Sequence, residues 1–189
     1  MTRRTAAHPD LTRPDVEAPF FSTWRVGTPE RQRRTVEAIA RTWERRDWPG
    51  DGLRSYHVYA GHDGETLLHH SQWASEAAYE AFVKTRRQER VDEIDTAVPG
   101  IERLGLGRYR RHGGLAREAG DSRVPGLVTT ARADRAEPVE REPGLISAHV
   151  HLSTDGTHVL TYAEWAEAAP APRGLVVSRY EHALGLVPG

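Results

Sequence analysis

The stretch Gly52-Leu-Arg-Ser-Tyr-His57-Val58 returns later in the chain as Gly144-Leu-Ile-Ser-Ala-His149-Val150, at an offset of 92 residues. The same offset aligns two further dipeptides with identical ones: Asp63-Gly64 with Asp155-Gly156, and Trp73-Ala74 with Trp165-Ala166. Ten identities fall in this ungapped alignment. An internal repeat of this kind decides the fold, because each copy is expected to form one supersecondary unit.

The segments that both copies retain have the composition of β-strands. In the first copy, residues 54–60 and 66–73 flank Asp63-Gly64, a dipeptide typical of a tight hairpin turn. Residues 20–26 and 104–112 form two more β-rich runs. The sequence therefore predicts four strands in the first copy.

Two amphipathic helices are predicted between these strands of the first copy. The helix over residues 28–46 begins at Thr28, a good N-cap, and Pro29 suits its first turn. A second helix is predicted over residues 75–98, before Pro99-Gly100. The second copy is shorter at the two corresponding places, by 15 and 21 residues, so most of both helices is expected to be missing there.

The order strand, helix, strand, strand, helix, strand predicts an α+β fold. We expect tandem ferredoxin-like (βαββαβ) repeats that form an intrachain α+β barrel, with the second repeat lacking most of its helix. The predicted parts are a flexible arm, a complete repeat that carries the site, a linker, and a degenerate repeat of mainly strands: residues 1–17, 18–112, 113–125 and 126–189. Since the stripped second sheet would expose apolar side chains, we expect the arm or a second copy of the chain, in a homodimer, to cover it.

The composition excludes several classes of protein. The chain has 189 residues, a net charge of −1 and a pI near 6.8, which argues against nucleic acid as a partner. It has no apolar run long enough for a membrane span and no apolar segment near its start, so we expect a cytoplasmic protein without membrane contact. The absence of cysteine excludes disulfides and thiol nucleophiles. No spacing typical of a metal site is present, and none is expected.

The first copy also resembles a known family. Four of its motifs, in chain order, carry the resemblance: His57-Val58, Asp63-Gly64, Gln72-Trp73 and Ser75-Glu-Ala-Ala-Tyr79. They are similar to motifs of the antibiotic biosynthesis monooxygenase family, in the dimeric α+β barrel superfamily. With its second copy, the chain looks like the tandem two-domain members of that family.

The resemblance implies a cofactor-independent monooxygenase that tailors an aromatic polyketide, oxidising an anthrone-type ring to a quinone with molecular oxygen. The physical chemistry is coherent, because a deprotonated phenol is electron-rich enough to reduce oxygen when the protein holds the developing oxyanion. Two alternatives stay open. One is a polyketide cyclase or isomerase of the same pathway, and the other is a non-catalytic protein that binds a polyketide or accompanies another enzyme.

The resemblance also implies where the site lies. It places Trp73 and Tyr79 in a pocket between sheet and helices, and it puts Tyr59 and His69 at positions where the family often carries His and Asn. An imidazole can act as a base near neutral pH, which makes His69 a candidate. The predicted catalytic residues are Tyr79, His69 and Trp73, and the predicted substrate-binding residues are Trp73, Tyr59, His57 and Phe82. The competing interpretation for each aromatic residue is ordinary packing in the core.

Overall fold

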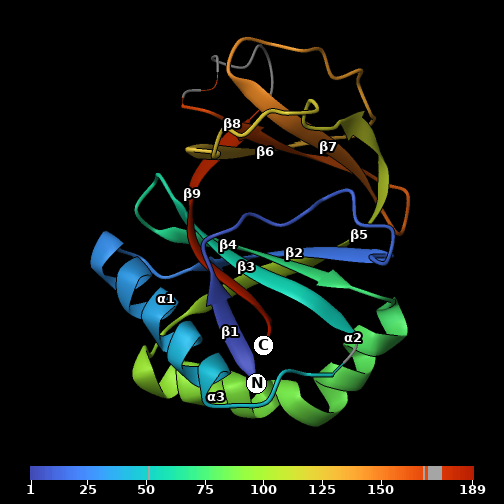
Figure 1. The fold of residues 1–189 in the computed structure, drawn as a ribbon. Helices are drawn as coiled ribbons and strands as arrows, with labels where there is room; N and C mark the ends of the chain where they lie inside the picture. Colours follow the sequence, from blue (N-terminus) through green and yellow to red (C-terminus); the bar gives the residue numbers. More distant parts are fainter. Residues whose placement is uncertain (51, 168, 170–175) are drawn as a thin grey trace.

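The computed structural model describes residues 1–50, 52–167, 169 and 176–189 (Figure 1). The strands are β1 (Thr2–Thr5), β2 (Ala18–Arg25), β3 (Leu53–Gly61), β4 (Thr66–Trp73), β5 (Glu102–Leu115), β6 (Leu127–Ala133), β7 (Leu145–Ser153), β8 (Val159–Trp165) and β9 (Val177–Pro188). The helical segments are α1 (Pro29–Glu44) and a continuous run of α2 (Glu76–Phe82), the π-helical η1 (Val83–Arg87) and α3 (Gln88–Ala97).

Eight of the strands form one closed antiparallel barrel. The hydrogen-bonded order is β9-β3-β4-β2-β5-β7-β8-β6, and β6 pairs again with β9 to close the ring. Strand β1 lies outside the ring, on β9. Two long strands join the halves of the chain, because β5 pairs with β2 and then with β7, while β9 pairs with β6 and then with β3.

This architecture corrects the predicted fold class. Tandem ferredoxin-like repeats, each with a sheet of its own, are not what the chain forms; the strands of both halves belong to a single barrel. The physical reason lies in β5 and β9, whose outer edges would stay unpaired in two separate sheets and are instead hydrogen-bonded across the halves. The hairpins themselves were predicted correctly, with turns at Gly64 and Gly156, both at positive φ.

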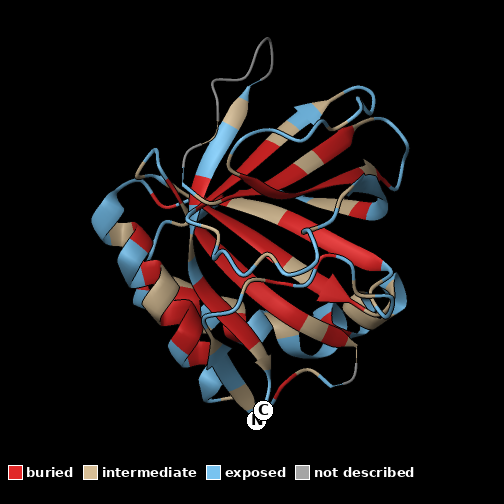
Figure 2. Cartoon of the chain, turned by 45° about the horizontal axis from the view of Figure 1, so that its top comes forward, coloured by how far each residue is buried: buried red, intermediate tan, exposed pale blue. Residues whose placement is uncertain are grey.

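All the described helices lie against one half of the barrel (Figure 1). Helix α1 is capped by Thr28, and α2 by Ser75, whose side chains accept hydrogen bonds from the backbone N–H groups of Arg31 and Ala78. The helices bury one face against β2, β3 and β4 and expose the other (Figure 2). The space between helices and strands is therefore enclosed on this half alone.

The second half carries no helix among its described residues, yet its apolar side chains are not bare. Leu145, Ala148, Ala163 and Trp165 form a buried cluster, against which the loop residue Val139 packs. The exposed sheet that motivated the homodimer is thus covered within one chain, and the homodimer itself stays a prediction.

Residues 1–17, predicted to be a flexible arm, are packed against the barrel. Residues 2–5 pair with β9, and the side chains of His8 and Leu11 reach inward. His8 Nδ1 lies 3.3 Å from a carboxylate oxygen of Glu164, and Leu11 joins the apolar cluster inside the barrel. The arm was judged loose from its polar and proline-rich composition, which does not reveal backbone pairing with a distant strand.

The barrel interior is unusually rich in histidine. His57, His70, His149, His151 and His182 point inward from four strands, alongside Tyr59 and Tyr162. Burial lowers the pKa of each of these imidazoles, to about 3 for His151 and about 4 for His182. The interior histidines are therefore neutral at pH 7.

The first prediction concerns the seam between β5 and β7. Gly114 has φ of +130°, and a Cβ there would lie 2.1 Å from the carbonyl oxygen of Ala148. We expect Gly114→Ala to lower the free energy of unfolding by roughly 2–4 kcal/mol, measured by urea denaturation. The neighbouring Gly113→Ala is the control, because a Cβ there meets nothing within 4 Å, and a loss equal to that of Gly114→Ala would contradict the account.

The second prediction follows from the interior histidines. Their folded-state pKa values lie below the unfolded value near 6.5, so the unfolded chain binds more protons as the pH falls through that range. Stability should therefore be complete above about pH 6.5 and decline toward pH 4. Urea denaturation at pH 7 and pH 5 should show a loss of at least roughly 2 kcal/mol. Equal stability at the two pH values would show that these imidazoles are not buried in the neutral form.

Candidate functional site

A cavity of about 270 Å³ lies between the barrel wall and the helices. Its floor is formed by β2, β3, β4 and β5, and its roof by the helical run from α2 to α3 with α1 at one side. Seven of the residues that line it have aromatic rings: Trp24, Trp43, Tyr56, His69, Trp73, Tyr79 and Phe82. Such a wall suits a flat apolar ligand that needs a few fixed polar contacts.

The outer part of this wall is a cluster of rings held at fixed angles. The rings of Trp73 and Tyr79 meet edge to face, with centroids 5.4 Å apart, and Tyr79 meets Phe20 in the same way at 4.8 Å. Phe82 lies 5.3 Å from Trp73. The indole N–H of Trp73 donates to Ser71 Oγ at 2.9 Å, which fixes the plane of the indole. Trp73 is buried, whereas Tyr79 is half-buried at the edge of the cavity.

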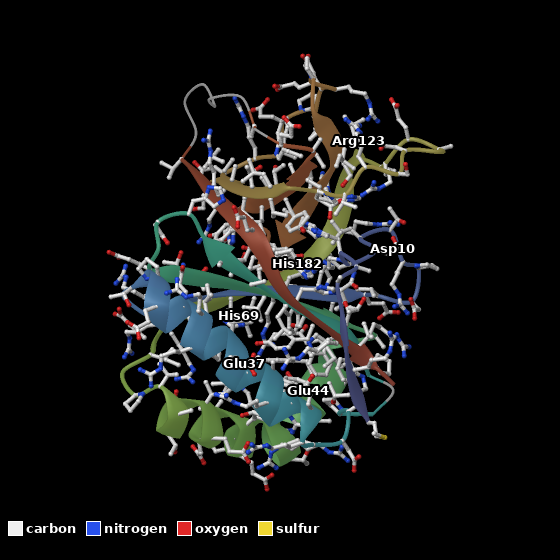
Figure 3. The ribbon with its side chains drawn as sticks, turned by 60° about the vertical axis from the view of Figure 1, so that its left-hand side comes forward. Asp10, Glu37, Glu44, His69, Arg123 and His182 are labelled. Atoms are coloured by element: carbon white, nitrogen blue, oxygen red, sulfur yellow. The ribbon has the colours of Figure 1, made fainter. Side chains whose placement is uncertain are left out.

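The polar centre of the cavity is a pair formed by His69 and Tyr56. His69 Nδ1 lies 2.7 Å from the hydroxyl oxygen of Tyr56, and the imidazole packs on the indole of Trp24 with ring centroids 4.1 Å apart. His69 Nε2 is buried and has no hydrogen-bond partner among the described residues. In Figure 3, His69 lies on the side of the barrel wall that faces the helices. A buried imidazole nitrogen without a partner is costly, so this atom is available to a ligand.

Electrostatics keep this pair uncharged. Burial, and then the positive charge of Arg103, lower the pKa of His69 to about 3. Burial raises the pKa of Tyr56, so the phenol stays protonated. The phenol can then donate its proton to Nδ1, and the proton of the neutral imidazole sits on Nε2. In that tautomer Nε2–H is a hydrogen-bond donor that has no acceptor among the described residues.

Guanidinium groups lie against the aromatic wall, and those of Arg103 and Arg90 lie over its tryptophan rings. Arg103 stacks 4.6 Å above Trp24 and pairs with both carboxylate oxygens of Asp95, at 2.8 and 3.2 Å. Arg90 lies 4.8 Å above the ring of Trp43 and is buried. Both contacts are cation–π interactions.

The predicted site residues separate into two groups. Trp73, Tyr79, His69 and Phe82 all line the cavity, as described above. Tyr59 and His57 do not, because they point into the barrel interior. There the hydroxyl of Tyr59 lies 2.9 Å from that of Tyr162, and His57 Nδ1 lies 3.1 Å from His182 Nε2.

A β-bulge explains this separation. Leu53 pairs with Trp73, but the next pair is Ser55 with Gln72, so Arg54 is an extra residue on β3. The bulge inverts the alternation of side chains after it. It turns Tyr59 inward and places Tyr56, which the sequence analysis did not single out, on the cavity side.

Sequence reasoning also missed the cationic groups of the site. Arg90 belongs to a run of arginine and glutamate residues that looks like a solvated helix face. The π-helical segment Val83–Arg87 shifts the helical phase by adding a residue to a turn, and Arg90 is buried as a result. Trp24 lies in a predicted strand and Trp43 in a predicted helix, and their place at a cavity had no signal in the sequence.

Across the described ranges, no group of three or more His, Asp or Glu side chains is arranged to hold a metal ion. A search of the same residues for a helix long and apolar enough to cross a membrane also found none.

Comparisons with known proteins show the fold. No protein-family profile matches the chain, and no curated protein matches its sequence. Among solved structures, an anthrone oxidase-like protein is similar with a TM-score of 0.61 and 16% identity, covering 91% of this chain and 93% of its own. A candidate monooxygenase from Lactobacillus acidophilus NCFM has a TM-score of 0.58 and 8% identity, covering 89% and 95%. A candidate monooxygenase from Fusobacterium nucleatum has a TM-score of 0.57 and 7% identity. The match covers 89% of this chain and 94% of that protein.

The comparisons also correct the expectation of a cofactor-free reaction. Two structures of chlorite dismutase from Candidatus Nitrospira defluvii match with TM-scores of 0.48 and identities of 13% and 14%. A fold positions a cavity without deciding which group supplies the electrons. That expectation was wrong as an inference from the fold, and we do not retain it.

The third prediction tests the state of His69. Because the pKa of His69 is about 3, its ¹⁵N chemical shifts should stay those of a neutral imidazole from pH 7.5 to pH 4.5, with the proton on Nε2. Tyr56→Phe removes the donor to Nδ1 and should change the balance of tautomers. An imidazole that gains charge between pH 7 and pH 5.5 would contradict the burial of this pair.

Proposed function

We propose that this chain oxidises an electron-rich, flat aromatic compound in the cavity between the barrel wall and the helices. The specific form of the proposal is oxidation of an anthrone-type polyketide to a quinone in a cytoplasmic antibiotic pathway. The observation that carries it is His69, a neutral imidazole that lines an aromatic cavity and whose buried Nε2 has no partner among the described residues. Structural similarity to an anthrone oxidase-like protein supports it at the level of fold.

The shape of the cavity suits a compact fused-ring substrate. Its volume of about 270 Å³ is close to the lower end of the range of about 300–1,000 Å³ that is usual for small-molecule sites. Trp73 and Tyr79 offer two ring surfaces nearly at right angles, with an interplanar angle of 77°. A flat substrate can stack on one and meet the edge of the other.

Oxidation of an anthrone requires the protein to favour the ionised form of the substrate. Loss of a proton from the methylene group of an anthrone places negative charge on the ring oxygen. A hydrogen bond from His69 Nε2–H and the positive field of the nearby arginines would stabilise that oxyanion and so lower the substrate's own pKa. Since the pKa of His69 is about 3, the imidazole serves as a donor and is a poor proton acceptor.

The overall reaction balances with one molecule of oxygen. The methylene carbon loses two hydrogen atoms and gains one oxygen atom as a carbonyl group. The second oxygen atom leaves as water, and the four electrons that the carbon loses reduce the oxygen molecule.

A second candidate function rests on the same donor. Stabilising an enolate by Nε2–H would also serve a cyclase or isomerase of the same pathway, which needs no oxygen. An anaerobic assay separates the two, because only the oxidase should stop. A cavity that binds the ring without turning it over in either assay would instead indicate a non-catalytic binding protein.

The fourth prediction tests the role of His69 in turnover. Oxygen uptake with an anthrone should fall by about 10²–10³-fold in His69→Ala, the loss typical of removing one oxyanion donor. His69→Gln should recover part of the rate, because a glutamine amide can still donate. Trp73→Phe should raise KM more than it lowers kcat.

The matched control for this prediction is Tyr59→Phe. Tyr59 lies in the barrel interior, so removing its hydroxyl should cost about 1 kcal/mol of stability and leave the rate within about twofold of the wild type. Wild-type rates in His69→Ala would refute the proposed site, and a rate lost in Tyr59→Phe alone would move the site to the barrel interior.

A further inference from the structure

We propose that the ligand of this cavity carries a negatively charged group, and that Arg90 is the residue that recognises it. This inference rests on the proposed function only in taking the cavity as the substrate site. The observation behind it is a buried guanidinium that lacks a carboxylate partner. Arg90 is 4% exposed, yet no carboxylate of the residues that the structure describes lies within ion-pair distance of it.

The hydrogen bonds of Arg90 leave its charge uncompensated. Its two terminal nitrogens donate to backbone carbonyl oxygens, those of Arg86 at 2.9 Å and Asp47 at 2.8 Å. Its Nε is buried and has no partner in the described part of the chain. Neutral carbonyl groups orient the guanidinium, but they supply no counter-charge.

The nearby acidic side chains are committed elsewhere. Glu89 and Glu93 are close enough to influence Arg90, but both bind Arg46, with Glu93 at 2.5 Å. Arg46 and Arg86 add positive charge on the same side. Around Arg90 the balance of charge therefore favours an incoming anion.

Arg103, another of the arginines that line the cavity, is a cation whose charge is compensated by a carboxylate. It has a carboxylate partner in Asp95, bound by two hydrogen bonds. An unpaired buried charge is strongly destabilising, whereas a paired one is close to neutral. The contrast assigns the recognition of an anion to Arg90 and a mainly structural role to Arg103.

The geometry also narrows the class of ligand. The guanidinium of Arg90 lies 4.8 Å above Trp43 and 5.6 Å from Phe82, so an anion that reaches it must be attached to a body that fits between aromatic rings. A carboxylate on a fused aromatic ring fits this description, since guanidinium groups bind carboxylates in charge-assisted pairs. The substrate class is therefore an aromatic acid rather than a neutral aromatic compound.

Binding of two matched probes tests this inference without any need for turnover. The probes are anthraquinone-2-carboxylate and the neutral 2-(hydroxymethyl)anthraquinone, followed by quenching of tryptophan fluorescence at pH 7. The wild type should bind the carboxylate at least tenfold more tightly than the alcohol. In Arg90→Gln that preference should fall below twofold while the affinity for the alcohol stays within twofold, and Arg90→Lys should keep part of it.

Arg103→Gln is the matched control within the cavity, and it should keep a preference of at least fivefold. Unchanged affinity for the neutral probe in Arg90→Gln shows that this variant is folded. If Arg90→Gln does not fold, Arg90→Lys replaces it, and its preference for the carboxylate should be lower than that of the wild type. No preference in the wild type, or a preference lost in Arg103→Gln and kept in Arg90→Gln, would overturn the inference. A charge preference that depends on Arg90 would stand even if no anthrone were oxidised, and anthrone oxidation without it would leave the proposed function intact.

Discussion

Closure of the barrel through β5 and β9 is the constraint on which the rest of the structure depends. Each of these long strands pairs with strands from both halves of the chain, so neither half has a free sheet edge at the seams. The close pairing of these strands requires glycine at some positions. At Gly114 the backbones of β5 and β7 approach too closely for a side chain. Once the wall is closed, every strand residue must face either the interior or the outside.

That division creates two chemically different environments. The interior holds neutral histidines and a pair of tyrosines, Tyr59 and Tyr162, whose rings meet edge to face. The outer face of the first half is roofed by helices and keeps an aromatic cavity with one unpartnered imidazole nitrogen. The second half carries no helix in the part that the structure describes, and loop and strand residues pack on its sheet. Both halves thus contribute strands to the closed barrel, while the helix-covered cavity lies on the first half.

Much of this could be read from the sequence, for identifiable reasons. The hairpins at Asp63-Gly64 and Asp155-Gly156 and the two helices follow from local turn and capping signals. Trp73, Tyr79 and His69 were expected at one site from the family resemblance, and they line one cavity together with Phe82. The fold class was wrong because pairing between distant strands leaves no local signal.

Two errors in the predicted site, one on β3 and one on the helix that carries Arg90, each have a single local cause. The single extra residue Arg54 inverts β3, which sent Tyr59 and His57 inward and brought Tyr56 to the cavity. The π-helical turn before Arg90 turns a residue of an apparently solvated face toward the aromatic wall. Bulges of both kinds add one residue to a regular period, and periodicity alone cannot locate them.

The central claim is that the chemistry lies on the helix side of the barrel wall, at His69 Nε2. The most direct measurement is a crystal structure of the protein with a bound anthraquinone. The account predicts the ring against Trp73 and Tyr79, with a carbonyl oxygen within hydrogen-bond distance of His69 Nε2. Density for the ligand in the barrel interior beside Tyr59 and His57, or in the cavity with no contact to His69, would contradict it.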